Sequence, residues 1–283
     1  MRYLFLLFLV GAQTVVLGQR AYFQQQTDHV IEVELDDALH MLHGEITTTY
    51  LNNSADSLDM LWIHLWPNAY KDGTTALAKQ QFREGNQLMF WAMQRALGGI
   101  DSLDFKVAGE PVQWSFHPEH RDIARLELAN PLGPGERMTY STPFRVKLPS
   151  GKISRLGHIG ETYQITQWYP KPAVYDRDGW HPMPYLNQGE FYSEYGSFDV
   201  SITLPSNYVV GATGDMDPKE ADNEREMAFL DSLALATARR IDGSAFDAEE
   251  FSTDEAMEFP ASSEQTKTLR YRQSNVHDFA WFA

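Results

Sequence analysis

Apolar and polar residues alternate along most of the chain, which predicts strands. In residues 29–35, His-Val-Ile-Glu-Val-Glu-Leu, successive side chains suit opposite faces of a half-buried strand. Turn-forming residues separate similar runs, and a hairpin is predicted at 107–112. Further strands are predicted over 44–51, 58–66, 122–129, 138–148, 197–204 and 208–213. The pattern therefore predicts a mainly β fold.

Two segments change to a helical period. Apolar residues in 74–97 fit one or two short helices, and Gly98-Gly99 follows as a stop. A second helix is predicted near 218–240, with Asp217 as its N-cap and Pro218 in its first position. Its apolar side would consist of Met227, Leu230, Leu233, Ala234 and Thr237. We therefore expect short helical insertions in the mainly β fold.

The N-terminus resembles a secretory signal peptide over residues 1–18. Met1-Arg2 supplies a positive start, residues 3–10 are almost wholly apolar, and Gly18 offers a small residue for cleavage. A membrane anchor is the alternative, but it needs about 20 apolar residues, and polar residues at 13–14 interrupt this run. No later segment is apolar enough to span a membrane. We expect an exported protein, periplasmic or extracellular, that begins near Gln19.

Composition narrows the possible functions. The chain has 283 residues, of which 43% are hydrophobic, as in a globular protein. Its net charge of −16 argues against a nucleic-acid partner, because a phosphate backbone needs a basic surface. The absence of cysteine excludes disulfides, thiolate zinc sites and cysteine nucleophiles. Residues 215–264 hold 15 of the 39 acids but only 4 bases, so the acidity is concentrated in one apparent insertion.

The sequence contains few catalytic motifs. None of the nine histidines begins the His-Glu-x-x-His motif of zinc peptidases, and His40/His43 and His117/His120 have only the outer spacing. On a strand or a proline-broken loop such pairs need not converge, so we interpret them as ordinary surface histidines. A Gly-x-Ser-x-Gly elbow is also absent. Residues 175–179 resemble the start of a calcium loop, but no Glu stands at the twelfth position, which favours a simple turn.

Aromatic residues are dense between 150 and 196, where Glu190 and Glu194 also lie. Paired carboxylates beside aromatic rings occur in glycosidases, but there the pair is defined by distance in space rather than in sequence. Two interpretations remain open from the residues alone: an aromatic-packed domain junction and a sugar-binding surface.

Five segments carry a family resemblance through their order along the chain. They are Leu-Trp-Ile-His-Leu-Trp-Pro-Asn at 61–68, Gln-Ile-Thr-Gln-Trp-Tyr-Pro-Lys-Pro-Ala-Val-Tyr-Asp at 164–176, Gly-Glu-Phe-Tyr at 189–192, Val-Val-Gly-Ala-Thr-Gly at 209–214 and Asn-Val-His-Asp-Phe-Ala-Trp at 275–281. The chain resembles the N-terminal half of zinc aminopeptidases of the aminopeptidase N type, peptidase family M1, in their exported bacterial branch.

The resemblance implies a saddle-like, multi-sheet β domain over 19–283, with the acidic insertion at 215–264. In this family that domain forms part of the substrate cleft, beside a thermolysin-like catalytic domain that carries the zinc. We therefore expect the chain to be truncated before that domain. Zinc would belong to the parent enzyme, with no metal ligand or catalytic residue in this chain, which would be inactive alone. Its partners would be peptide substrates and the missing catalytic domain.

One substrate-binding residue is implied inside this domain. In the family, an acid or amide nine residues before the Pro of an aromatic-Pro pair helps to hold the substrate's free α-amine. With Tyr169-Pro170 as the pair, that position is Glu161. Thr166 departs from the pattern, because the family has a basic residue there. The alternative function, from a different class, is a free-standing β-sandwich that binds glycan or protein in an exported protein.

Overall fold

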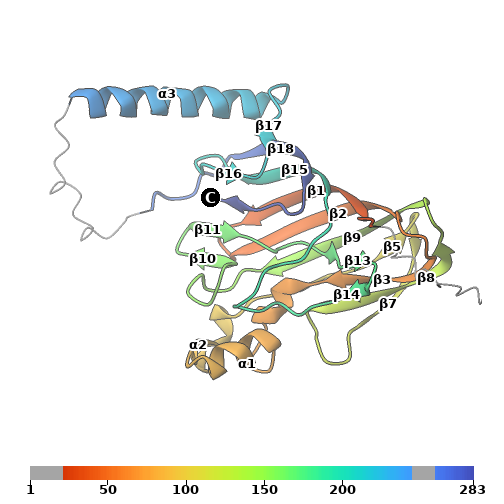
Figure 1. Ribbon diagram of the computed structural model, residues 1–283. Coiled ribbons are helices and arrows are strands. Elements are labelled where there is room, and N and C mark those ends of the chain that lie inside the picture. Colours follow the sequence, from red (N-terminus) through yellow and green to blue (C-terminus); the bar gives the residue numbers. More distant parts are fainter. Residues whose placement is uncertain (1–21, 244–258) are drawn as a thin grey trace, which may run out of the picture.

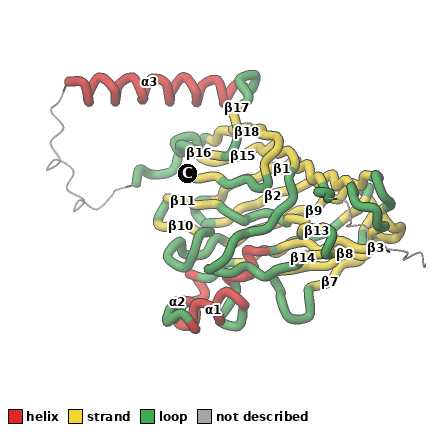
Figure 2. The backbone as a smooth tube through the Cα atoms, viewed as in Figure 1, coloured by secondary structure: helices red, strands yellow, loops and turns green. Residues whose placement is uncertain are grey.

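The computed structural model describes residues 22–243 and 259–283, which fold into several β sheets with helices at two ends (Figures 1 and 2). The mainly β fold is as predicted. The signal peptide expected at 1–18, and residues 244–258 of the acidic insertion, lie outside the described residues. None of the described helices is long and apolar enough to cross a membrane.

The largest sheet has nine strands and is organised around β1 (Gln26–Asp36). β1 pairs antiparallel with β2 (Met41–Leu51) and parallel with β15 (Gly196–Pro205), which lies far away in sequence. The sheet order is β17 (Asp215–Met216), β18 (Thr266–Val276), β15, β1, β2, β9 (Arg137–Lys147), β5 (Lys106–Val107) and β6 (Glu110–Pro111), and β4 (Gly99–Asp101) also pairs with β9.

Two smaller sheets and a hairpin complete the β structure. One sheet has the order β12 (Lys171–Pro172), β3 (Leu58–His64), β8 (Ile123–Leu132) and β7 (Gln113–Phe116); the other has the order β10 (Gly157–Ile159), β11 (Thr162–Ile165), β19 (Trp281–Phe282) and β16 (Gly211–Ala212). The hairpin joins β13 (Val174–Asp176) and β14 (Gly179–His181), so the turn predicted at 175–179 is confirmed. The strand predicted over 208–213 is reduced to the two residues of β16.

The strand pattern explains the core. On β1, Ile31, Val33 and Leu35 are buried, while Glu32 and Glu34 between them are exposed, as the alternation predicts. In the hairpin predicted at 107–112, β5 and β6 flank Ala108 and Gly109, with φ of 50° and 87°. Two successive positive φ angles match the twist that a tight hairpin needs.

Much of the aromatic segment belongs to this core. Tyr163, Trp168, Tyr169 and Tyr185 are at most 1% exposed. Trp168 meets Trp281 of β19 edge to face at 6.3 Å between ring centroids. These rings therefore pack inside the core of this domain, which argues against a sugar-binding surface.

Residues 66–97 form a compact helical region. The single-turn helix η1 (Trp66–Tyr70) follows β3, and the predicted insertion at 74–97 folds as α1 (Ala76–Arg83), α2 (Leu88–Trp91) and the turn η2 (Gln94–Ala96). Thr75 caps α1 by accepting a hydrogen bond from Ala78 N at 3.3 Å. In Figure 1, α1 and α2 lie at the opposite end of the molecule from α3.

The second predicted helix differs in its start, its length and its contact side. α3 (Ala221–Gly243) has 23 residues and begins after Pro218. Asp217 instead accepts a hydrogen bond from Lys219 N at 3.0 Å, which closes the turn before the helix. Of the predicted apolar side, Leu233, Ala234 and Thr237 are exposed.

The side of α3 that is buried is polar for a physical reason. Asn223 donates to Arg270 O at 2.7 Å and accepts from Arg270 N at 3.0 Å, on the outer edge of β18. Glu226, one turn later, is paired with Lys267 of the same strand. Because an open strand edge presents unpaired backbone groups, polar side chains make the better contact. The later turns of α3 extend away from the sheets (Figure 1).

We predict that Gly196→Ala is strongly destabilising. A Cβ at Gly196, at the start of β15, would lie 1.8 Å from Thr27 O of β1. Backbone cannot move aside without breaking the β1–β15 pairing, so the cost should reach or exceed the upper end of overpacking penalties, about 3 kcal/mol. Gly211→Ala is the control, because nothing lies within 4 Å of its Cβ position. Urea denaturation of both variants measures the difference, and equal midpoints would contradict the prediction.

Candidate functional site

A buried ion pair joins two distant parts of the chain. Lys171 of β12 is 2% exposed, and its Nζ lies 2.9 Å from Oδ1 of Asp278. The same carboxylate accepts hydrogen bonds from Tyr169 OH at 2.9 Å, from Phe279 N at 2.9 Å and from Gln167 Nε2. We call Gln167, Tyr169, Lys171 and Asp278 the Asp278 cluster. Every charge in this cluster has a hydrogen-bonded partner, as a buried charge requires.

Local backbone geometry turns these side chains to the same side. Gln167 has a φ of 55°, a left-handed value that redirects the chain just after β11. Beyond it, alternate residues point in opposite directions, as in any extended segment. Tyr169 and Lys171 therefore face Asp278, whereas the indole of Trp168 enters the core and donates to Phe279 O at 3.0 Å.

Apart from the Asp278 carboxylate, Lys171 is surrounded by neutral groups, two of them aromatic rings. Its Nζ lies 4.9 Å from the ring centroid of Trp66 and 5.3 Å from that of Tyr169, both within cation–π distance. Burial lowers the pKa of Lys171, and the Asp278 carboxylate opposes that change. Burial, reinforced by the Lys171 charge, lowers the pKa of nearby His29 to about 3. His29 is therefore a neutral partner of Thr48, 2.9 Å from its Oγ1.

The two carboxylates noted in the aromatic segment have different environments. Glu190 is exposed, whereas Glu194 is 4% exposed and accepts a hydrogen bond from Tyr175 N at 3.2 Å. Burial raises the pKa of Glu194 to about 8. The sequence alone gives no reason to distinguish the two acids; the difference between them is that the structure buries Glu194.

Glu161 lies apart from the Asp278 cluster. It occupies the two-residue turn between β10 and β11, is half-buried, and makes no hydrogen bond or ion pair with the described residues. The four residues of β11, about 13 Å of extended chain, separate it from the segment that reaches Asp278. Two nearby amides are already engaged: Gln164 donates to Ser154 O at 3.0 Å, and Gln167 accepts from Lys171 at 2.8 Å. The oxygen of Gln167 is therefore engaged, whereas Gln164 uses only its Nε2; of the three side chains, Glu161 is the one that carries a charge, and its carboxylate makes no hydrogen bond or ion pair with the described residues.

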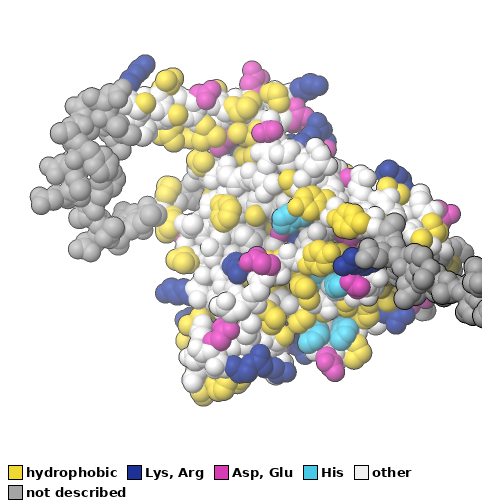
Figure 3. Space-filling view, viewed as in Figure 1, with side chains coloured by type: hydrophobic (Ala, Val, Ile, Leu, Met, Phe, Trp, Pro, Cys, Tyr) yellow, Lys and Arg dark blue, Asp and Glu magenta, His cyan; other side chains and the backbone are white. Residues whose placement is uncertain are grey.

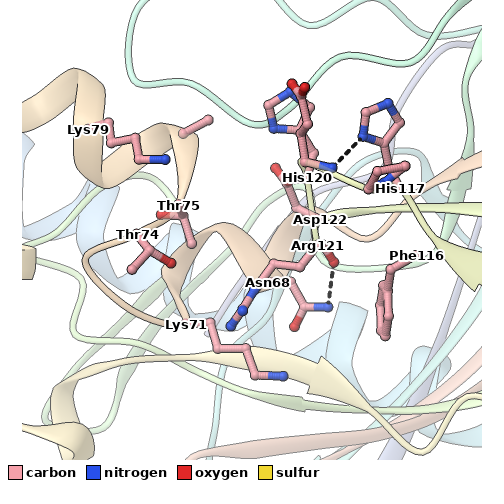
Figure 4. A pocket seen from close by; sticks show the side chains of 13 residues that line it. Asn68, Lys71, Thr74, Thr75, Lys79, Phe116, His117, His120, Arg121 and Asp122 are labelled. Atoms are coloured by element: carbon pink, nitrogen blue, oxygen red, sulfur yellow. Dashed lines mark hydrogen bonds between the residues drawn. The ribbon is translucent and has the colours of Figure 1, made fainter.

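The histidine pair His117/His120 borders a cavity of about 570 Å³ that Lys71, Lys79 and Arg121 also line (Figure 4). The two rings stack with their centroids 5.1 Å apart, and Nδ1 of His117 accepts a hydrogen bond from Glu119 N. This geometry leaves His117 only its Nε2 for another partner.

The other pair does not converge. His40 stacks on His158 with 3.6 Å between centroids and bonds Tyr163 OH, whereas His43 is exposed on β2. Within residues 22–243 and 259–283, no group of three His, Asp or Glu side chains is placed to hold a metal ion.

Comparison with known proteins finds similarity only among solved structures. No family model and no curated protein matches the chain. The M1 zinc metallopeptidase from Deinococcus radiodurans is similar at 13% identity with a TM-score of 0.44, and a mutant of it at 15% with 0.45. The same mutant bound to a Tyr-Ser-Ala substrate gives 13% and 0.45. Each comparison covers 94% of this chain and 43% of the other, so the chain spans less than half the length of these proteins.

We predict that Lys171→Met destabilises the fold by about 1.5–3 kcal/mol, because the Asp278 carboxylate, whose side chain is 18% exposed, loses its charged partner. Adding Asp278→Asn should recover much of this loss, since the amide oxygen still accepts from Tyr169 and Phe279. Lys106→Met is the control: its partner Asp104 is 64% exposed, so the change should stay within about 1 kcal/mol. Chemical denaturation measures all three, and a double variant no more stable than Lys171→Met would contradict the prediction.

We also predict a pH dependence that originates at Glu194. Its pKa is about 8 in the folded protein and near 4.5 when unfolded. Between these values the unfolded carboxyl ionises while the folded one keeps its proton. Stability therefore falls as pH rises through this window, by about 1.4 kcal/mol per pH unit at most.

Glu194→Gln keeps the acceptor for Tyr175 N and removes the ionisation. The gain in unfolding free energy over wild type should grow from pH 5 to pH 8 and then level off. The buried histidines are common to both proteins and cancel in this difference. If the difference in unfolding free energy between Glu194→Gln and wild type stayed constant from pH 5 to pH 8, Glu194 would not be the group that titrates.

Proposed function

We propose that this chain is the substrate-cleft domain of an exported zinc metallo-aminopeptidase, whose catalytic domain lies outside these 283 residues. The observation that carries the proposal is the meeting of segments 164–176 and 275–281 in the Asp278 cluster. These are two of the five segments on which the sequence resemblance rests. Gln167, Tyr169 and Lys171 come from the first segment and Asp278 from the second.

Two more of these segments meet beside the cluster. Trp66, from segment 61–68, has its ring 4.8 Å from that of Phe191, from segment 189–192. Lys171 lies over the same Trp66 ring. Short motifs that matched by chance would be scattered over the fold. Four that pack on one another support a shared structural role.

The zinc belongs elsewhere in this proposal. The described residues offer no set of three converging ligands, so they do not fit a catalytic zinc site. We therefore derive no chemical step from this chain. Its part is to supply one wall of the cleft and to help anchor the free amine of a peptide, while zinc and the general base act from the other domain.

Glu161 is the proposed contact to that amine. An ammonium group needs carboxylate or carbonyl oxygens that are not already engaged. The Glu161 carboxylate meets this condition within the described residues. Its half-buried position on the β10–β11 turn also reduces solvent screening compared with a fully exposed acid.

The alternative, a free-standing glycan- or protein-binding module, has weaker support. It needs a surface of aromatic rings in 163–195. Four of the nine rings are buried in the core and three more pack against it, so only Tyr192 and Tyr195, at 43% and 45% exposed, are open to a ligand.

The proposal is tested on the complete polypeptide encoded by the gene. Reading the coding sequence beyond Ala283 should reveal His-Glu-x-x-His. The purified polypeptide should hold one zinc per chain and release amino acids from substrates with a free N-terminus, and a chelator should abolish this activity. A polypeptide without zinc and without this activity would overturn the proposal.

We predict that Glu161→Ala in that polypeptide lowers kcat/KM about 10- to 150-fold for free-amine substrates. The reason is the loss of one charge-assisted hydrogen bond, roughly 1.5–3 kcal/mol. Zinc content and melting temperature should stay unchanged. The control is Glu110→Ala, which removes an exposed acid from the small hairpin strand β6. Wild-type kcat/KM in Glu161→Ala would exclude Glu161 as the amine contact while leaving the peptidase proposal intact.

A further inference from the structure

The region of α1 and α2 exposes large apolar side chains that have no role in the cluster described above. Trp91 is 79% exposed, Met93 64%, Phe82 and Phe90 47%, and Leu88 42%. We call these five side chains the apolar tip. They lie within twelve residues of sequence, where an ordinary soluble surface shows single apolar residues scattered among polar ones.

Four side chains of the apolar tip are grouped in two pairs. Phe82 of α1 and Phe90 of α2 contact each other with 4.7 Å between ring centroids. Leu88 and Trp91 line one shallow cavity of about 550 Å³ together with Ile153. Met89, 2% exposed, fixes α2 to the core from below. The apolar side chains are therefore presented outward by an anchored element.

The indole of Trp91 suits a boundary between water and an apolar phase. Its Nε1 donates to Gln87 Oε1 at 3.1 Å, within its own helical turn. The ring can thus leave water without losing a hydrogen bond. Tryptophan, an amphipathic ring, is also enriched at membrane interfaces.

The charge around the apolar tip is opposite in sign to that of the whole protein. Basic side chains outnumber acidic ones on and beside its elements: the bases are Lys79, Arg83, Arg95, Lys147 and Lys152, and the acids are Glu84 and Asp72, of which Asp72 is already paired with Arg121. Lys147 is held there by a hydrogen bond from its Nζ to Gln94 O at 2.7 Å. The chain as a whole carries −16. In Figure 3, dark blue side chains border yellow ones at the lower end of the molecule.

We propose that the apolar tip docks on the surface of an anionic lipid bilayer. Basic side chains would contact lipid phosphates while Trp91, Phe90 and Met93 enter the headgroup region, the arrangement of interfacial protein segments. The acidic remainder of the molecule is repelled by the same surface, which fixes the orientation with the tip inward. A symmetric dimer through the tip would instead place two sets of five cations against each other.

Vesicle sedimentation tests the proposal on the chain from Gln19 onward, because the apolar run at 3–17 would bind vesicles by itself. The chain should bind vesicles of phosphatidylcholine with 30 mol% phosphatidylglycerol and release as salt rises, since screening weakens the charge contribution. The double variant Trp91→Ala/Met93→Ala should bind at least tenfold more weakly. Leu235→Ala, which removes a 60% exposed side chain on acidic α3, is the matched control and should bind as wild type.

A spectroscopic measurement separates insertion from adsorption by charge alone. Lipids brominated near the headgroup should quench part of the tryptophan fluorescence of wild type and not of Trp91→Phe, which keeps an apolar ring. Three results would overturn the proposal: no binding to anionic vesicles, equal binding by the double variant, or a dimer in solution that the double variant abolishes.

Discussion

The buried pair of Lys171 and Asp278 is the interaction on which much of the structure depends. An unpaired ammonium group in the position of Lys171 would cost several kcal/mol in lost hydration, so its burial requires the carboxylate of Asp278, whose own side chain is 18% exposed. The ion pair holds the segment that follows β11, which contains Lys171, against the segment that precedes β19, which contains Asp278. Those two segments in turn place Trp168 and Trp281 in the core. The ion pair and the contact of Trp168 with Trp281 thus join the same two distant segments of the chain.

Polar residues in this part of the molecule are of two kinds: those already hydrogen-bonded within the Asp278 cluster, and those with acceptors still free. Gln167, Tyr169 and Asp278 hydrogen-bond with one another and with Lys171, which makes them structural residues of the fold. Glu161 has the opposite character, since its carboxylate has no partner in the described part of the chain. A ligand can recruit only acceptors that the fold has not already used. We therefore expect any ligand of this domain to be bound by residues in turns such as that of Glu161, and not by the Asp278 cluster.

Acidic and basic side chains are concentrated in different parts of the molecule. The acidic residues of α3 lie at one end of the molecule, and basic residues gather around α1 and α2 at the other, as the positions of these helices in Figure 1 show. α3 attaches to β18 through Asn223 and Glu226, because a strand edge offers backbone groups and basic side chains rather than an apolar surface. The helix therefore needs no apolar contact side, and Leu233 on its predicted apolar side remains exposed.

Local patterns in the sequence determined the strands, the hairpins and the aromatic density, because alternation and turn chemistry depend on residues that are near one another in the chain. Ile31 and Val33 could be assigned to the core, and 175–179 to a turn, on that basis alone. The tertiary structure alone decided that Asp278 would meet Lys171 and that Glu194 but not Glu190 would lose its solvent. Those outcomes depend on which distant segments the sheets bring together, and burial and the pairing of charges are properties of that assembly rather than of any local sequence.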